Sequence, residues 1–208
     1  MSAASTRQQP AQPTDTIVVN GVTYRATATH LYRVHESHSV SPGALVDGGA
    51  NGGLAGNDMR VIETSLLHTA DVVGVTNDVM HALPLCQAVA KLPTASDGYI
   101  IGIFSNYAQR ADTGPTIHSK GQLESFGMIV DDKSRSVGGS QCIVTLEGYV
   151  VPLNIRDGLP YVDMEPPTDE EMDLLPHVYF CSDSPWDPAV LDCKFTAEDF
   201  DPPDIALE

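Results

Sequence analysis

Several features that would point to common protein classes are missing from this chain of 208 residues. Its four cysteines form no C-x-x-C pair and no secretory leader precedes them, so a disulfide framework is not indicated. We expect four reduced thiols in a cytoplasmic protein. Since no apolar run approaches the length of a membrane span, no membrane partner is expected.

Basic residues are also scarce, with 11 Lys and Arg against 28 Asp and Glu and a net charge of -17. Proteins hold a phosphate backbone mainly through Lys and Arg, which displace its counterions. We therefore expect no direct nucleic-acid partner. The acidity is concentrated in residues 164–208, which hold 13 acidic residues and a single basic one, Lys194.

Proline and glycine are spread along the whole chain, with 15 and 17 residues, and this favours short strands and turns over long helices. Residues 1–15 are polar and proline-bearing, and we expect a disordered linker there. The strongest hairpin signal is Asn20-Gly21 between the two β-rich runs of TIVVNGVTYRAT. Further hairpins are predicted with turns at Gly74, at Asp97-Gly98 and at Glu147-Gly148.

Helix is predicted only in short pieces, so the fold class is all-β. GQLESFG (121–127) is the best candidate, and TDEEMDLL begins with Thr168 as an N-cap and Glu171 at the reciprocal position of a capping box. After residue 164 no alternating strand pattern is seen. We expect a domain over 16–164 and an acidic extension over 165–208 that lies on the domain or stays partly disordered.

The stretch LVDGGANGGLAG (45–56) places Asp47 ahead of five glycines, at positions 48, 49, 52, 53 and 56. One interpretation is a surface turn, where aspartate bonds nearby amides. A phosphate-binding loop is disfavoured, because the spacing matches no such motif and no basic residue lies nearer than Arg60. The third interpretation is a catalytic carboxylate at the end of the short buried strand Ala-Leu-Val.

The same stretch resembles the active-site segment of retropepsin-like aspartic proteases in Copia-type retrotransposon polyproteins, above all those of algal type. TIHSKGQLESFG (116–127) is similar to the family's second signature, which forms a strand, a glycine and a short helix. EGYVVPLNIRDGLPYVDM (147–164) resembles its closing strands. The similarity covers about 16–164, and it implies a retropepsin-like closed β-barrel lobe with one short helix.

The resemblance assigns roles to individual residues. Asp47 matches the catalytic aspartate, and Gly48, Gly49 and Ala50 form the active-site loop. Gly121 matches the glycine that supports this loop from behind. The family has Ser or Thr where this chain has Gly48, and that hydroxyl braces the two active-site loops of a dimer; Gly48 has no side chain to do so.

The resemblance also implies a flap, a hairpin that closes over the substrate, between Asp47 and the second signature. Gly74 is the candidate tip. An ordinary turn would carry a glycine at this position just as well, because glycine is the default turn residue.

Only one aspartate of this kind is present, whereas the chemistry needs two carboxylates. The resemblance therefore implies a homodimer in which Asp47 and its symmetry mate share one proton and activate a water molecule. The substrate would be an extended polypeptide, the protein's own polyprotein, bound as an added strand under the flaps. No metal or cofactor is implied. The alternative is a catalytically impaired module of the same fold with a binding or structural role.

Other residue groups give weaker signals. His35 and His38 are three residues apart, but no cysteine pair or H-E-x-x-H helix accompanies them, so no metal site is predicted. His118 falls in the second signature, and we expect it to be packed rather than catalytic. Ser119 lacks the context of a catalytic nucleophile. Trp186, the single tryptophan, is predicted to anchor the acidic extension.

Overall fold

The computed structural model describes residues 16–19, 22–25, 43–74, 77–96, 98–110 and 114–194. The chain divides into two compact units, Met1–Ser39 and Val40–Glu208. In the first unit, β1 (Thr16–Val19) and β2 (Val22–Arg25) pair antiparallel with Val19 opposite Val22. The predicted first hairpin is therefore confirmed. The linker predicted over 1–15 lies outside the described residues.

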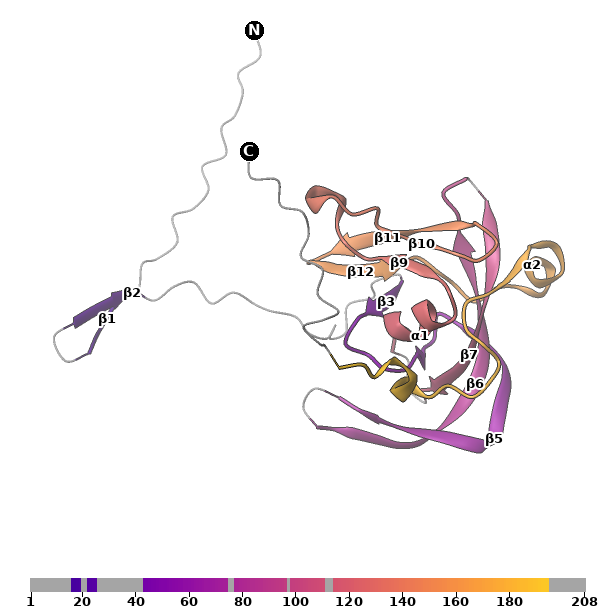
Figure 1. Ribbon diagram of the computed structural model, residues 1–208, viewed down its shortest axis with the longest axis horizontal. Helices are drawn as coiled ribbons and strands as arrows, with labels where there is room; N and C mark the ends of the chain where they lie inside the picture. The colour runs from indigo at the N-terminus through magenta and orange to yellow at the C-terminus, as the bar shows by residue number, and fades with distance from the viewer. Residues whose placement is uncertain are drawn as a thin grey trace, which may run out of the picture. The chain divides into compact units, whose positions relative to one another are not determined.

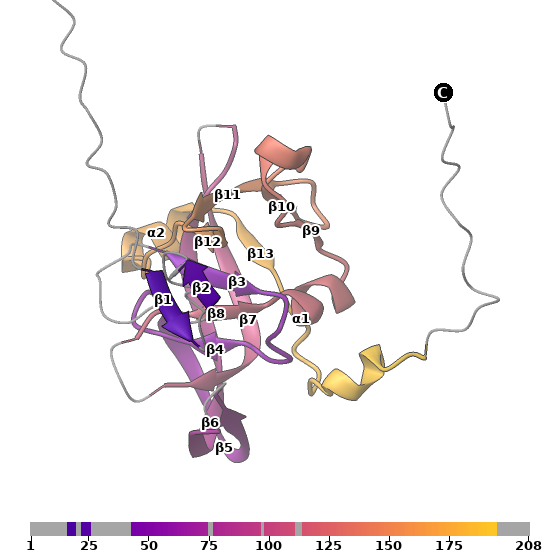
Figure 2. The ribbon, with the colours of Figure 1, turned by 90° about the vertical axis from the view of Figure 1, so that its left-hand side faces the viewer.

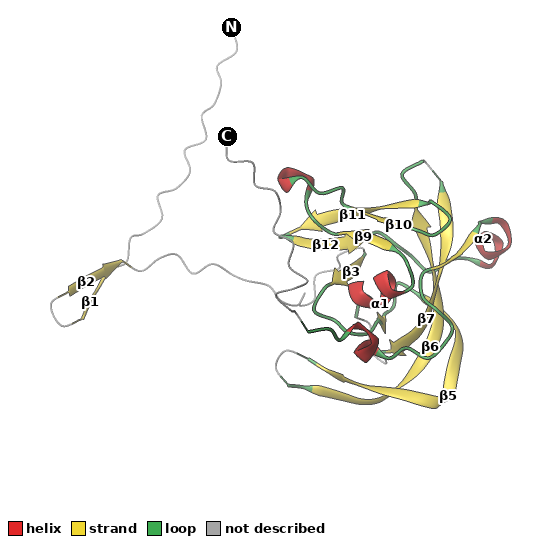
Figure 3. Ribbon diagram, in the orientation of Figure 1, coloured by secondary structure: helices red, strands yellow, loops and turns green. Residues whose placement is uncertain are grey.

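The second unit is built on one 11-stranded sheet of order β5-β6-β7-β4-β8-β3-β12-β11-β10-β9, with β13 paired to β7. Its strands are β3 (Ala44–Asp47), β4 (Leu54–Ala55), β5 (Arg60–Val73), β6 (Val79–Pro93), β7 (Tyr99–Gln109), β8 (Ile117–Ser119), β9 (Ile129–Asp131), β10 (Cys142–Val144), β11 (Val150–Arg156), β12 (Leu159–Val162) and β13 (His177–Tyr179). Strands dominate the unit and its helices are short (Figure 3), so the all-β prediction is confirmed.

This sheet curls into a half-barrel. Figure 1 shows β9–β12 on one side of the curl and β5–β7 on the other. Among the described residues, the terminal strands β5 and β9 do not pair with each other, so the sheet is open. The closed barrel implied by the resemblance is not what the described strands form.

The hydrophobic core follows β7, which reads YIIGIFSNYAQ and is buried over almost its whole length. The strand has β6 on one side and both β4 and β13 on the other, so its two edges are paired. A strand buried on both faces reads as a continuous apolar run rather than an alternating one. Phe104 and Tyr107 from β7 pack with Leu92 and Leu123 in the largest apolar cluster.

The three later hairpins occur where they were predicted. β5 and β6 turn at Gly74–Asp78, where the Gly74 amide donates to the Asp78 carbonyl at 2.8 Å. β6 and β7 turn at 94–98, and β10 and β11 turn beside Gly148, whose φ is +88°. The β5–β6 hairpin is much longer than the predicted strands, and its outer end extends beyond the rest of the sheet in both views (Figures 1 and 2).

Two short α-helices flank the sheet. α1 (Lys120–Ser125) begins after Ser119, whose hydroxyl accepts from the Gln122 amide, and the chain leaves it through Gly127 at φ +96°. α2 (Asp169–Leu174) begins with the full capping box of Thr168 and Glu171. Both helix predictions are confirmed. Two single-turn helices, η1 (Arg135–Val137) and η2 (Pro188–Leu191), complete the described elements.

The acidic extension contributes a strand to the sheet, although the sequence after residue 164 shows no alternating strand pattern. β13 runs parallel to β7 with Val178 opposite Gly102, and Val178 is buried. A strand of three residues is too short to show an alternating pattern. It forms because it pairs with the edge of β7. Lys91 forms ion pairs with Glu165 and Glu171 and ties the start of the extension to β6.

Candidate functional site

Asp47 ends the central strand β3. β3 runs parallel to β8, which places Asp47 opposite Ser119, and antiparallel to β12, which places Leu45 opposite Tyr161. Ala44 and Val46 are buried, whereas Asp47 is only partly buried. The strand thus delivers one carboxylate from the core to its boundary with solvent.

The loop after Asp47 folds back on the carboxylate. The Gly49 amide donates to Asp47 Oδ1 at 2.7 Å, which fixes one carboxylate oxygen and leaves the other available. A Cβ on Gly48 would have no heavy atom within 4 Å, and the Gly48 φ is not in the left-handed region. Position 48 could therefore carry a side chain without collision in the single chain.

Four hydrogen bonds from different elements fasten this loop. The Ser119 hydroxyl donates to the Ala50 carbonyl at 2.7 Å, and the Trp186 indole donates to the Asn51 carbonyl at 2.8 Å. The Gly53 amide donates to Gln122 Oε1 at 2.8 Å, and its carbonyl accepts from the Ala108 amide at 2.9 Å. A loop rich in glycine is thereby held to β8, α1, β7 and the extension.

Gly53 also packs on the core beneath the loop. A Cβ at this position would collide with the ring of Tyr107, which is fully buried. Only glycine lets the backbone approach an aromatic face so closely. The glycine-rich motif therefore has at least one position where packing demands glycine.

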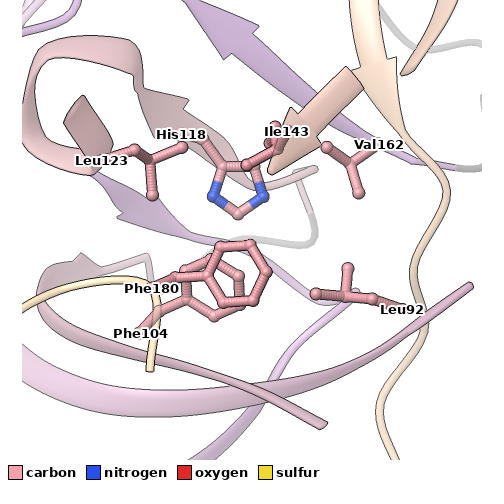
Figure 4. A pocket seen from close by; sticks show the side chains of 7 residues that line it. All are labelled: Leu92, Phe104, His118, Leu123, Ile143, Val162 and Phe180. Carbon is pink, nitrogen blue, oxygen red and sulfur yellow. The ribbon is translucent and has the colours of Figure 1, made fainter. Parts of the chain in front are cut away.

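The Tyr107 hydroxyl lies 2.9 Å from His118 Nδ1. The imidazole of His118 packs above the stacked rings of Phe104 and Phe180 in a small apolar pocket with no room for water (Figure 4). Its Nε2 has no hydrogen-bond partner among the described residues. Burial lowers the pKa of His118 to about 3, because a charged ring would lose its hydration in this pocket. His118 is packed, as predicted.

A second acid near the loop is structural. Asp58 accepts from the Thr116 amide at 3.0 Å and from the Thr116 hydroxyl at 2.5 Å, just before β8 begins. Burial raises the pKa of Asp58, and its hydrogen bonds with Thr116 oppose that effect. These contacts tie the end of the glycine-rich segment to the strand that runs beside β3.

A groove of about 710 Å³ lies between the β5–β6 hairpin and the extension. It is lined by Glu63, Thr64, Ser65, Leu66, Leu67, His68, Leu85, Cys86, Gln87, Ser105, Asn106 and Asp183. Asp47 does not line it. The Ser105 carbonyl accepts from Gln122 at 3.2 Å, so one side chain connects the groove to the loop after Asp47.

The structure brings some of the predicted site residues together. Asp47, Gly48, Gly49 and Ala50 form one turn at the end of β3. Gly121 lies in α1, where a Cβ would come within 2.8 Å of Leu191 from the extension. Gly74 lies at the far end of the β5–β6 hairpin.

The sequence does not reveal how the loop is supported. It gives no role to Ser119, which lacks the context of a nucleophile, and presents Trp186 only as an anchor for the extension. Nothing in it singles out Gln122. The parallel register of β3 and β8 points to Ser119, because it places that residue directly beside Asp47. No group of three or more potential metal ligands occurs in the described part of the chain, and His35 and His38 lie outside it.

Comparison of the chain with models of protein families, with curated protein sequences and with solved structures gave no match. No helix in the described ranges is both long and apolar enough to cross a membrane.

Proposed function

We propose that this chain is a retropepsin-like aspartic endopeptidase of a retrotransposon polyprotein, active as a homodimer. One observation carries the proposal: Asp47 ends the central strand β3 and remains partly exposed, and four elements hydrogen-bond to the loop that follows it. The parallel neighbour β8 leads straight into α1, which matches the strand and short helix that the sequence resemblance implies.

In the proposed dimer, the partly exposed Asp47 carboxylates of two copies face each other across one water molecule. Two carboxylates this close share one proton. The ionised carboxylate accepts a proton from water as general base, and the protonated one polarises the peptide carbonyl. In each copy the Gly49 amide keeps one Asp47 oxygen occupied, so the other oxygen meets the water.

The substrate class is an extended polypeptide, the protein's own polyprotein. The groove beside the β5–β6 hairpin, which Asp47 does not line, would hold a part of the polypeptide away from the cleaved bond, against Leu66, Leu67 and Ser105. Leu66 is 96% exposed and Leu67 88%, so both leucines are available to apolar substrate side chains. In this proposal the hairpin that ends at Gly74 acts as the flap.

A second function is favoured by two observations. Gly48 offers no hydroxyl to brace a partner loop, and Asp47 is not among the residues of the groove. The same fold would then bind a peptide in the groove without cleaving it.

The two functions separate in one experiment. The purified chain is incubated with an unfolded protein substrate between about pH 5 and 6, with and without pepstatin. We expect cleavage that pepstatin blocks and that Asp47→Asn reduces on the order of a thousandfold, because a catalytic group is lost without a change in shape. Asp173→Asn makes the same chemical change at an exposed position of α2 and should keep full activity.

Equal cleavage by the Asp47→Asn variant would contradict the endopeptidase. Peptide binding to both the wild type and the variant, with cleavage by neither, would identify the binding module instead.

A further inference from the structure

The loop at 48–53, which begins with the proposed active-site residues Gly48, Gly49 and Ala50, contains four glycines, at positions 48, 49, 52 and 53. Glycine loses more backbone freedom on folding than any other residue. A catalytic loop of this composition needs contacts that hold it in one conformation. Three of the four bonds that fasten it come from β7, β8 and α1, which are parts of the sheet and its helix.

The fourth bond comes from far along the chain. Trp186 is 135 residues from Asn51, and its indole nitrogen donates to the Asn51 carbonyl at 2.8 Å. A Cβ on Gly52 would come 4.0 Å from the same nitrogen, so the indole also lies near Gly52. Trp186 therefore contacts the middle of the loop, between the points held by Ser119 and Gln122.

The extension is itself fixed on both sides of the indole. Asn106, on β7, donates to the carbonyls of Ser182 at 3.0 Å and Ser184 at 2.7 Å. On the other side, Asp187 caps η2 by accepting from the Ala189 amide at 3.0 Å. η2 then brings Leu191 against Gly121 of α1. These contacts give the Trp186 side chain a defined position over the loop.

We propose that Trp186 is a positioning residue for the active site, which restricts the loop that carries Asp47. This inference rests on the proposed function. It gives the acidic extension a role in the protease, and it explains how a loop without a side chain at position 48 is kept in place. Trp186 acts through the Asn51 backbone and does not touch the reacting atoms.

The test is amide hydrogen exchange in the full chain, with Trp186→Phe as the variant. Phenylalanine keeps an aromatic ring and removes the donor. We expect exchange of the Gly53 amide, which donates to Gln122, to become roughly fivefold faster, the loss of about one hydrogen bond. Exchange in β6, and in β7 apart from Ala108, whose amide donates to Gly53, should not change. Tyr179→Leu is the matched control, because it removes an exposed aromatic ring from β13. It should leave amide exchange in the loop unchanged.

A second substitution separates positioning from simple loss of packing. Gly48→Ala adds a methyl group into open space and removes backbone freedom from the loop. In the Trp186→Phe background it should slow loop exchange again. If cleavage is observed, Trp186→Phe should lower kcat several-fold with little change in KM, because Trp186 does not line the groove.

Unchanged exchange at the Gly53 amide in Trp186→Phe would overturn the inference, and so would an equal increase throughout the sheet. The exchange result stands whether or not the chain cleaves a substrate. A failed cleavage assay with the expected exchange pattern would therefore reject the endopeptidase and keep the role of Trp186 in ordering the loop.

Discussion

The glycine-rich loop at 48–53 and the β5–β6 hairpin differ in how they are held in place. The loop at 48–53 has no regular secondary structure, yet four elements hydrogen-bond to it and Gly53 packs on a buried ring. The hairpin is made of two long strands, yet Leu66 and Leu67 at its bulge are 96% and 88% exposed. Restraint here comes from tertiary contacts rather than from strand pairing.

The hairpin's own pairing is irregular in its outer part. Thr64 pairs with Cys86 and Thr69 with Pro84, so residues 65–68 bulge from the ladder. Bulges bend a strand and interrupt its hydrogen bonds. In the proposed protease, the loop would hold Asp47 in place, and the exposed outer part of the β5–β6 hairpin would contact the bound peptide.

The same substitution, glycine to alanine, made in both regions gives the largest expected difference in stability. Gly53→Ala places a methyl group inside the Tyr107 ring, and we expect a loss of about 3 kcal/mol in the free energy of unfolding. Gly74→Ala places it 3.6 Å from the Asp78 carbonyl, an ordinary contact, and should change stability by less than about 0.5 kcal/mol. Urea denaturation of both variants measures the difference.

Equal losses in the two variants would show that the hairpin end is as tightly restrained as the loop. The comparison between the two regions would then fail.

A smaller effect is expected from the buried histidine beneath the loop. His118 has a pKa of about 3 in the folded chain against an ordinary value of 6.5, so between these values only the unfolded chain binds the proton. Stability should therefore fall as the pH drops below the ordinary value, by about 1.4 kcal/mol per unit and about 2 kcal/mol by roughly pH 5. His118→Phe removes this proton uptake and should flatten the dependence.

The measurement is urea denaturation at about pH 5, 6 and 7.5. The pKa of Asp58 is raised, so this residue adds to the stability of the folded chain as the pH falls. The quantity to compare is therefore the difference in unfolding free energy between wild type and His118→Phe at each pH, rather than the slope of either curve alone. His177→Gln, at an exposed position of β13, should retain the wild-type slope. If the unfolding free energies of wild type and His118→Phe changed equally with pH, His118 would not be the source of the loss of stability in acid.

Much of the fold was predictable because its signals are local. Turn residues at Asn20-Gly21, Gly74 and Gly148 located hairpins, and Thr168 with Glu171 located a capped helix. These signals act over a few residues, so neighbouring sequence is enough to interpret them.

The remainder depends on contacts between distant segments. β13 has only three residues, and it forms by pairing with the edge of β7. No local sequence pattern predicts that pairing. The open curl of the sheet follows from which strands pair, which single-strand patterns do not determine. At the site, Asp47 and its turn were located from sequence, whereas Gln122 and Trp186 reach the loop from 69 and 135 residues away.

Mixing two versions of the chain tests the central claim most directly, namely that one active site uses Asp47 from each of two copies. Wild type and Asp47→Asn are mixed at constant total concentration, well above the dimer dissociation constant, and cleavage is measured. Activity should fall with the square of the wild-type fraction, because mixed dimers carry only one carboxylate. A fall in direct proportion to that fraction would show that each chain works alone, and it would contradict the shared site.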